Sequence, residues 1–477
     1  MALSENSFSL RTDTHIHLVG IGGTGISAIA QVLIGRGFVV SGSDAQMNTY
    51  TAVLQNKGAT IYQGHAAANI SGAEVVIISS AIPETNPEIV AAHAANIPVL
   101  KRSDFLGALM AGSTGIAVAG SHGKTTTSGM IAHILVETET DPTVILGGLL
   151  PQWESNGRFG TGEFFVIEAD EYDYMFLGLR PTIAVITNIE HDHPDIFPTE
   201  VDYTTAFRQF AELLPSNGKL IVCGEDPGVQ NLLSQLDLAN EMTITYGIAG
   251  VGQSFTIQAL DVRPNQLGGV DFLVEQNGHT IGLARIRLPG LHNVHNALAA
   301  IAAALEAGIS FPHIVKALAG FGGVGRRFQV TGEVGGVTII DDYAHHPTEI
   351  RATLAAARQR YPGRRLWAVW QPHTYSRTKL YFDEFASSFQ DADRVVALDI
   401  YRSREKDTLG IDTAVVVAAM SHPNAVHIAE KEDAATYILD RVIPDDVILT
   451  LGAGDGNLVG QWVFEGLQNR LQPHKTT

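Results

Sequence analysis

The stretch AGSHGKTTT at residues 119–127 decides how this chain is expected to fold. It follows a short apolar run at 116–119 and precedes a helix-length segment at 128–136. A turn of this composition offers backbone N–H groups and a lysine to phosphate oxygens, and a hydroxyl to Mg²⁺. The spacing departs from the strict GxxxxGK[ST] pattern, because Val118 stands where that pattern has its first glycine. We predict a phosphate loop that joins a strand to a helix; a purely structural turn is the alternative.

Around this loop the sequence alternates short β-branched runs with helix-length segments, a pattern typical of parallel α/β sheets. One series begins at His15, a second at Gly115 and a third at Val337. Before the third series, alternating polar and apolar runs predict an antiparallel annex. The predicted fold class is therefore α/β with three domains. We place the boundaries near residues 111 and 328, which gives domains at 1–111, 112–328 and 329–477.

Composition limits the classes of function. The 477 residues include 50 acidic and 31 basic side chains, for a net charge of −19. Because this charge opposes attraction to phosphate backbones and anionic lipids, we expect no nucleic-acid or membrane partner. The single cysteine, Cys223, lies in an apolar run and is expected to be a buried small hydrophobe in a reducing compartment. Glycines and serines interrupt the uncharged run at 105–123, and residues 1–20 show no export signal, so we expect a cytoplasmic protein.

A second glycine turn, GIGGTG at residues 20–25, lies between a strand-like run and a helix-like segment. It fits the GxGxxG fingerprint, in which glycines let the backbone approach a pyrophosphate at a helix N-terminus. Asp44 closes the next strand and can accept a hydrogen bond from a ribose. Taken alone, the turn supports NAD binding and an NAD-linked oxidoreductase. Tight packing of strand against helix would also explain it.

Acidic and histidine side chains follow two strands of the second series. EADE occupies residues 168–171 and NIEHDH occupies 188–193, each directly after an apolar run. Because the carboxyl ends of parallel strands converge on one crevice, these groups are expected to face the phosphate loop. Carboxylates and imidazoles beside nucleotide phosphates suit a hard divalent cation better than zinc, since no cysteine lies near. Solvated loop acids are the alternative for each segment.

Polar segments in the last third of the chain indicate further ligand contacts. LPGLHNVHN at 288–296 opens an alanine-rich helix with amides that can read a base edge or cap the helix. GRRF at 325–328 places two guanidiniums at the second domain border, where phosphate or carboxylate is a suitable target. DDYAHHP at 341–347 and HTYSR at 373–377 each follow an apolar strand. Two such clusters in one domain argue for a second substrate.

The motifs of this chain closely resemble, in the same order, those of the bacterial Mur ligases: GIGGTG, GSHGKTTT, EADE, NIEHDH, LPGLHNVHN, GRRF, DDYAHHPTE and HTYSRT. The resemblance extends over almost the whole chain. It implies an N-terminal Rossmann-like domain for a UDP-sugar, a central P-loop-type ATPase domain and a C-terminal Rossmann-like domain for an amino acid. It also moves the first glycine turn from NAD to a UDP-sugar, because both ligands present a diphosphate to a helix N-terminus.

The resemblance also implies a reaction. It is greatest to the members that use ATP and Mg²⁺ to join L-alanine to the lactyl carboxylate of UDP-N-acetylmuramate, through an acyl phosphate, in peptidoglycan precursor synthesis. Tyr172 follows EADE where serine is common in those members, and EADEY also resembles the ligases that attach a recycled murein tripeptide. No lysine lies between His193 and Lys219, where members that add later residues place a modified lysine. We predict alanine addition by a monomer or homodimer, with tripeptide addition as the alternative.

Carried over position by position, the resemblance implies a set of site residues. The ATP phosphates would contact Lys124 and the backbone of Gly120, Ser121, His122, Gly123, Thr125 and Thr126. Mg²⁺ would lie among Thr125, Glu168 and His193, with Asn188 nearby. The adenine side would meet His292, Asn293 and Asn296, and the domain border would add Arg326, Asp341 and Asp342. The UDP group would lie at Gly22, Gly23, Asp44, His65 and Ser80. The amino acid would lie near Tyr343, His345, His346, His373 and Arg377, with its carboxylate on Arg377. The expected catalytic groups are Lys124, Glu168, His193 and Arg326.

Overall fold

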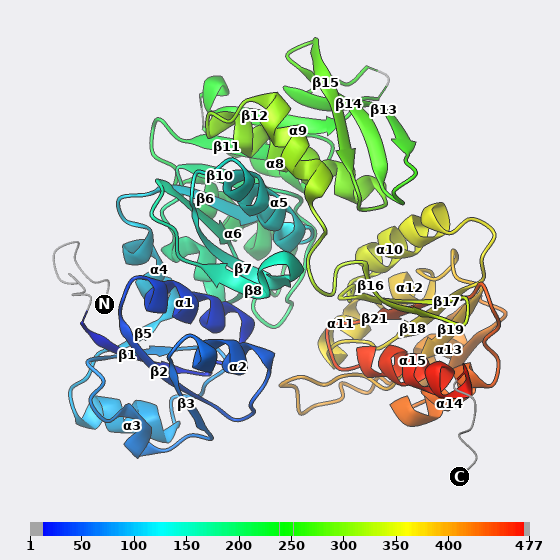
Figure 1. Ribbon diagram of the computed structural model, residues 1–477, viewed down its shortest axis with the longest axis horizontal. Helices are drawn as coiled ribbons and strands as arrows, with labels where there is room; N and C mark the ends of the chain where they lie inside the picture. The colour runs from blue at the N-terminus through cyan, green and yellow to red at the C-terminus, as the bar shows by residue number, and fades with distance from the viewer. Residues whose placement is uncertain (1–12, 238, 251, 472–477) are drawn as a thin grey trace.

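The computed structural model describes residues 13–237, 239–250 and 252–471. Three sheets follow one another along the chain, from blue through green to red, and helices flank each of them (Figure 1). The predicted α/β class with three domains is confirmed, and the boundaries near 111 and 328 stay a prediction. Most of the stretch inspected for an export signal lies outside the described residues. No helix in the described part is both long and apolar enough to cross a bilayer.

The first sheet is parallel throughout its described strands, in the order β3-β2-β1-β4-β5. The strands are β1 (His15–Val19), β2 (Val39–Asp44), β3 (Thr60–Gln63), β4 (Val75–Ile78) and β5 (Val99–Lys101). The helices are α1 (Thr24–Gly35), α2 (Thr49–Asn56), α3 (Pro87–Ala94) and α4 (Arg102–Met110), with the 3₁₀ helix η1 (Ala67–Ile70). The strand order reverses beside β1, which leaves a crevice at its carboxyl end. The N-terminus of α1 lies at this crevice, directly after the first glycine turn.

The second sheet has the order β15-β14-β13-β12-β11-β10-β6-β9-β7-β8. Its strands are β6 (Thr114–Ala119), β7 (Thr143–Leu150), β8 (Ser155–Arg158), β9 (Phe164–Glu168), β10 (Ile183–Ile186), β11 (Lys219–Cys223), β12 (Thr243–Ile248), β13 (Ile257–Pro264), β14 (Val270–Gln276) and β15 (His279–Ile286). Its helices are α5 (Lys124–Glu137), α6 (Glu200–Ala211), α7 (Pro227–Leu233), α8 (Leu291–Glu306) and α9 (Phe311–Gly320), with the 3₁₀ helices η2 (Pro151–Trp153), η3 (Tyr172–Gly178) and η4 (Asn240–Met242).

The predicted antiparallel annex is present, and it extends the second sheet instead of forming a separate one. β12 pairs with β13 in parallel, and β13, β14 and β15 continue from there as antiparallel neighbours. The annex therefore lies at the edge far from the phosphate loop, which follows β6 in the middle of the sheet.

The third sheet has the order β16-β17-β21-β18-β19-β20. Its strands are β16 (Gln329–Val334), β17 (Val337–Asp342), β18 (Leu366–Trp370), β19 (Arg394–Ala397), β20 (Ala425–His427) and β21 (Val447–Leu451). Its helices are α10 (Pro347–Arg360), α11 (Tyr375–Leu380), α12 (Phe382–Ala386), α13 (Thr413–Ala419), α14 (Lys431–Leu439) and α15 (Asn457–Leu471). β16 pairs antiparallel with β17, and the remaining described pairs are parallel. The polar segments that begin at Asp341 and at His373 therefore come from strands that end at one edge.

The strand before the phosphate loop shows why the centre of the molecule is rigid. Residues 116–119 are all 0% exposed, and a continuous apolar run is what a parallel strand needs when both of its faces are covered. Burying each of the larger side chains in this run contributes about 1.5–3 kcal/mol. The phosphate loop consequently starts from a fixed backbone, and α5 continues from it into the buried layer that α8 shares.

Candidate active site

The phosphate loop is fastened to the residues that follow β10. Ser121 N–H donates to the carbonyl of Asn188 at 3.0 Å, and His122 N–H donates to the Asn188 side chain at 2.9 Å. Gly120 has a φ of +133°, and a Cβ at this position would stand 1.9 Å from Thr187 Oγ1. The close approach of the two strand ends thus requires glycine at this position. This close approach places the phosphate loop at the N-terminus of α5, the positive end of the helix dipole, where an anion is favoured.

Lys124 begins α5 and turns back over the loop. Its Nζ donates to the carbonyls of Gly120 at 2.5 Å and Ser121 at 3.2 Å, and it lies 2.9 Å from a carboxylate oxygen of Glu171. Burial alone would lower the pKa of Lys124, but the carboxylates of Glu171, Asp170 and Glu168 together outweigh burial and raise it. A charged ammonium is therefore already in place beside the loop, and it can exchange these partners for phosphate oxygens.

A hydroxyl and a carboxylate lie together beside this lysine. Thr125 Oγ1 donates to Glu168 Oε1 at 3.0 Å, and Gly147 N–H donates to Glu168 Oε2 at 2.7 Å. Burial raises the pKa of Glu168. An alcohol and a carboxylate oxygen are ligands that Mg²⁺ accepts, so the donor set fits this ion. His193, the third residue predicted at the metal, has its Nε2 3.8 Å from a Glu171 oxygen instead.

His122 of the loop joins the central domain to the C-terminal domain. Its Nε2 lies 2.9 Å from Glu190 Oε2, and its Nδ1 lies 3.2 Å from Glu349 Oε1 on α10. Burial alone would lower the pKa of His122, but the hydrogen bonds to these two carboxylates raise it to about 9. Thr348 Oγ1 donates to the other Glu190 oxygen at 2.8 Å. A charged imidazolium between two carboxylates therefore fixes α10 against the phosphate loop.

A second polar bridge joins the same two domains. Arg377 donates from Nε and from a terminal nitrogen to Asp192 Oδ1 at 3.0 and 2.9 Å, and both side chains are buried. Burial alone would raise the pKa of Asp192, but Arg377 holds it well below its usual range. Burial lowers the pKa values of His345 and His373 to about 4 and about 3, so both rings beside this pair are neutral near pH 7.

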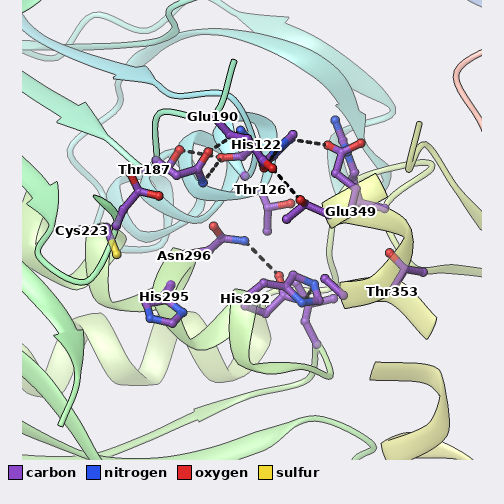
Figure 2. A pocket seen from close by; sticks show the side chains of 18 of the residues that line it. His122, Thr126, Thr187, Glu190, Cys223, His292, His295, Asn296, Glu349 and Thr353 are labelled. Carbon is purple, nitrogen blue, oxygen red and sulfur yellow. Dashed lines mark hydrogen bonds and ion pairs between the residues drawn. The ribbon is translucent and has the colours of Figure 1, made fainter. Parts of the chain in front are cut away.

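A cavity of about 360 Å³ opens between the phosphate loop, α8 and α10 (Figure 2). The predicted adenine residues His292, Asn293 and Asn296 line it. Asn296 Oδ1 accepts from Thr127 Oγ1 at 3.2 Å, and a Cβ at Gly123 would stand 2.4 Å from this oxygen. Burial lowers the pKa of His292 to about 4, so its ring is neutral. The cavity is thus a mostly apolar slot with amide groups in its wall, which suits a nucleobase.

A larger cleft, of about 770 Å³, receives side chains from all three domains. The first domain contributes Thr24, Gly25, Tyr50 and Arg102; the central domain contributes Lys124, Thr125, Glu168 and His193, with Arg326 at its border; the C-terminal domain contributes Tyr343, His345, His373 and Arg377. His122 and Gly123 line both this cleft and the smaller cavity. The structure therefore brings together, in one cleft, residues predicted to bind phosphate, metal and amino acid. The smaller cavity, which is the size of a base, is adjacent to this cleft.

Several predicted residues do not line either cavity: Gly22, Gly23, Asp44, His65, Ser80, Gly120, Asp341 and His346. Asp44 Oδ2 accepts from Gly22 N–H at 2.9 Å, so this carboxylate holds the glycine turn. Asp341 Oδ2 accepts from Arg326 Nε at 3.0 Å and positions that guanidinium. His346 is 1% exposed and packs on the His122 ring.

Arg102 and Tyr50 are among the cleft residues of the first domain that sequence reasoning missed. Arg102 lies over the N-terminus of α1, since a Cβ at Gly25 would stand 2.3 Å from its terminal nitrogen. It directly follows β5, so the rule that predicted EADE and NIEHDH from strand ends would also have found it. Tyr50 lies on α2 and carries no comparable signal in the sequence.

Known proteins match the chain over nearly all of its length. Three family models match: "Mur ligase family, catalytic domain" at 15–114, "Mur ligase middle domain" at 118–304 and "Mur ligase, glutamate ligase domain" at 326–454. UDP-N-acetylmuramate–L-alanine ligase of Acidobacterium capsulatum is 43% identical over 457 residues, 96% of this chain and 98% of that protein. Among solved structures, UDP-N-acetylmuramate–alanine ligase of Thermotoga maritima has a TM-score of 0.79 at 29% identity, covering 96% of this chain and 99% of that one. Murein peptide ligase of Psychrobacter arcticus has a TM-score of 0.73 at 26% identity, covering 96% and 100%.

Proposed function

The chain belongs to the Mur ligase family, and we propose that it uses ATP to join L-alanine to the lactyl carboxylate of UDP-N-acetylmuramate, a step of peptidoglycan synthesis. One observation carries the proposal: the 770 Å³ cleft, in which Lys124 lies with polar side chains from all three domains. A ligase of three substrates needs such a meeting point, because the reacting groups must be held together away from bulk water.

We assign the nucleotide to the smaller cavity and the phosphate loop. The adenine occupies the slot lined by His292, Asn293 and Asn296, and the phosphates extend past Gly123 to Lys124. His122 and Gly123 line both hollows, so a molecule that spans them must pass over the loop. The neutral His292 can face a base without an unpaired charge.

Thr125 and Glu168 would hold Mg²⁺ beside the phosphates. When bound, the ion neutralises phosphate charge and polarises the transferred group. Thr125 donates to Glu168, and this hydrogen bond holds the two oxygen ligands next to each other.

The chemistry proceeds in two displacements. The lactyl carboxylate oxygen attacks the γ-phosphorus, and the bond from this phosphorus to the β–γ bridging oxygen breaks. ADP departs as the leaving group, and the product is an acyl phosphate. The uncharged amine of alanine then attacks the acyl carbon, the amine loses a proton, and phosphate leaves. Lys124 and Arg326 provide fixed positive charge in the cleft where negative charge develops.

The first and third domains supply the other substrates. We assign the UDP-sugar to the crevice at the N-terminus of α1, where Arg102 adds a positive charge, and the amino acid to the region of His345, His373 and Arg377. The domain boundaries near 111 and 328 and a cytoplasmic site of action remain part of this proposal.

A tripeptide is the alternative acceptor, because Tyr172 follows EADE. Its ring packs edge-on to His193 at 5.1 Å, and its hydroxyl donates to Asp195 at 3.0 Å. Tyr172 thus lies next to a residue of the cleft, at a position that can influence the size of the acceptor.

The test is ADP release by the purified protein with ATP, Mg²⁺ and UDP-N-acetylmuramate, with L-alanine or L-alanyl-γ-D-glutamyl-diaminopimelate as the acceptor. We expect ADP release to require the sugar nucleotide and an acceptor together, and L-alanine to be the better acceptor. ADP release that does not depend on either substrate would refute the ligase activity. A preference for the tripeptide would show that the protein attaches a recycled tripeptide instead of L-alanine.

A further inference from the structure

A cluster of three potential metal ligands lies in the wall of the smaller cavity, outside the phosphate and magnesium groups. Cys223 ends β11, Glu225 follows it, and His295 lies in the second turn of α8. One ligand atom from each residue lies within 4.8 Å of the other two, and all three residues line the cavity. Figure 2 shows Cys223 and His295 together on the side of the cavity opposite α10. We call these residues the Cys–Glu–His cluster.

Hydrogen bonds to the backbone orient two of the three ligands. His295 Nδ1 lies 3.1 Å from the carbonyl of Leu291, and because a carbonyl can only accept, Nδ1 carries the hydrogen. Glu225 Oε1 accepts from Ile248 N–H at 3.0 Å, which leaves Oε2. His295 Nε2 and Glu225 Oε2 then face each other in close contact. Two lone pairs in this arrangement need a proton or a metal cation between them, and a fixed Nδ1–H is the usual support of a metal-binding Nε2.

Cys223 adds a third potential ligand beside this pair, which is what a metal site needs and a shared proton does not. It was predicted to be a buried small hydrophobe, and it is 7% exposed, yet it lines the cavity. A metal that binds its thiol displaces the thiol proton to solvent and leaves a thiolate. Thiolate, carboxylate and neutral imidazole together balance the charge of a dication, so the filled cluster is neutral.

The ligand types select the metal. Sulfur and imidazole nitrogen favour zinc over magnesium or calcium, which prefer oxygen ligands. Tetrahedral zinc places sulfur and nitrogen ligands about 3.5 Å apart, and the three ligand atoms of the cluster all lie within 4.8 Å of one another, so small side-chain movements bring them to that geometry. Three protein ligands leave a fourth position, and this position faces the cavity.

We propose that the Cys–Glu–His cluster is a zinc site, and that zinc bound there competes with the nucleotide for the smaller cavity. The competition rests on the proposed function, since it requires the adenine to occupy this cavity. The metal site itself does not, because all three of its ligands are side chains of this protein. Zinc would act as an inhibitor that releases when the free metal concentration falls.

Cobalt(II) tests the site, because thiolate ligation gives this ion an intense near-ultraviolet charge-transfer band and the chain has a single cysteine. Metal-free full-length protein titrated with Co²⁺ is expected to develop the band to a plateau at one equivalent, and Zn²⁺ should abolish it. The band should vanish in Cys223→Ser and in His295→Gln, each checked for native circular dichroism. It should persist in the control His279→Gln, which changes an exposed histidine of β15. No band in the wild type, or a band retained in a folded His295→Gln protein, overturns the site.

The competition is tested by the Kd of ADP with and without Zn²⁺ in wild type and in Cys223→Ser. At a zinc concentration ten times its own Kd, a competing metal raises the apparent Kd of ADP about tenfold. Chelation of zinc by ADP raises the apparent Kd of ADP equally in both proteins. Only the wild type should show the further, roughly tenfold increase that competition causes. Equal ratios in the two proteins overturn the competition. If ADP does not bind the metal-free wild type at all, the nucleotide assignment fails, while the cobalt band still reports on the metal site.

Discussion

Replacing Lys124 with alanine removes an ammonium that serves both the free protein and the reaction. In the proposed mechanism it balances the negative charge that develops on the transferred phosphoryl group. Removing one preorganised charge of this kind costs about 3 kcal/mol of transition-state stabilisation, which is roughly a hundredfold in rate. The ammonium contacts the loop carbonyls directly, and alanine places no charge there, so we expect the full loss.

The same substitution also threatens the fold, because Lys124 is 2.9 Å from Glu171, whose side chain is 1% exposed. Removing one partner of a buried ion pair typically costs about 3–5 kcal/mol, since the other charge is left without compensation. The double variant Lys124→Ala/Glu171→Gln removes that charge as well. A glutamine oxygen can still accept the hydrogen bond that Tyr203 donates to Glu171 at 3.1 Å.

The two effects separate in one experiment. Thermal unfolding of wild type, Lys124→Ala, Glu171→Gln and the double variant should show stability lost in the first substitution and largely recovered in the double variant. ADP release that depends on UDP-N-acetylmuramate and L-alanine should stay about a hundredfold low in both proteins that lack Lys124. A folded double variant that retains more than a tenth of the wild-type rate would refute the role of this lysine.

Three further predictions concern the loop and its neighbours. Glu190 and Glu349 raise the pKa of His122 to about 9 from a model-compound value of 6.5. The contribution of these contacts to the stability of the folded protein is therefore complete below pH 6.5 and is lost as pH rises through 9. The melting temperature should therefore fall between pH 7 and 10 more steeply in wild type than in His122→Gln, and equal slopes would contradict this. In Gly120→Ala the added Cβ would stand 1.9 Å from a threonine hydroxyl, so ADP binding measured by calorimetry should be lost, and an unchanged Kd would show that the loop does not bind phosphate. In Glu168→Gln the Mg²⁺ concentration for half-maximal activity should rise at least tenfold, whereas an unchanged requirement would place the metal elsewhere.

The sequence predicts the sheets well where hydrophobic periodicity is strong. The runs before the phosphate loop and before Glu168 are continuous and apolar, because parallel strands are covered on both faces. β8 could not be found this way, since its sequence SNGR carries no apolar pattern. Asn156 on this strand instead accepts a hydrogen bond from Gln31 of the first domain at 2.9 Å. Its structure is set by a contact between domains, which local periodicity does not encode.

In the candidate site, too, the sequence predicts residues that follow apolar strands and misses roles that depend on contacts between distant segments. Residues that follow central strands, such as Glu168, were predicted because a parallel sheet places all its strand ends at one edge. Sequence reasoning assigns no role to Glu349, which forms the link from α10 to His122 of the phosphate loop. Its partner is 227 residues away in sequence. Cys223 was assigned to the core by the apolar run around it, and only the position of α8 places it in a cavity wall.

The pairing of Arg377 with Asp192 changes what the predicted amino-acid site must do. Arg377 alone was expected to receive a carboxylate, but in the structure its guanidinium is already compensated, and Asp192 stays anionic because its pKa is held well below the usual range. A substrate with only a carboxylate would have to displace Asp192 and leave that buried charge unpaired. A free amino acid carries both charges, so its carboxylate can contact Arg377 while its ammonium contacts Asp192, and neither protein charge loses compensation. We therefore expect the buried pair to favour a zwitterion over a simple carboxylic acid of the same size.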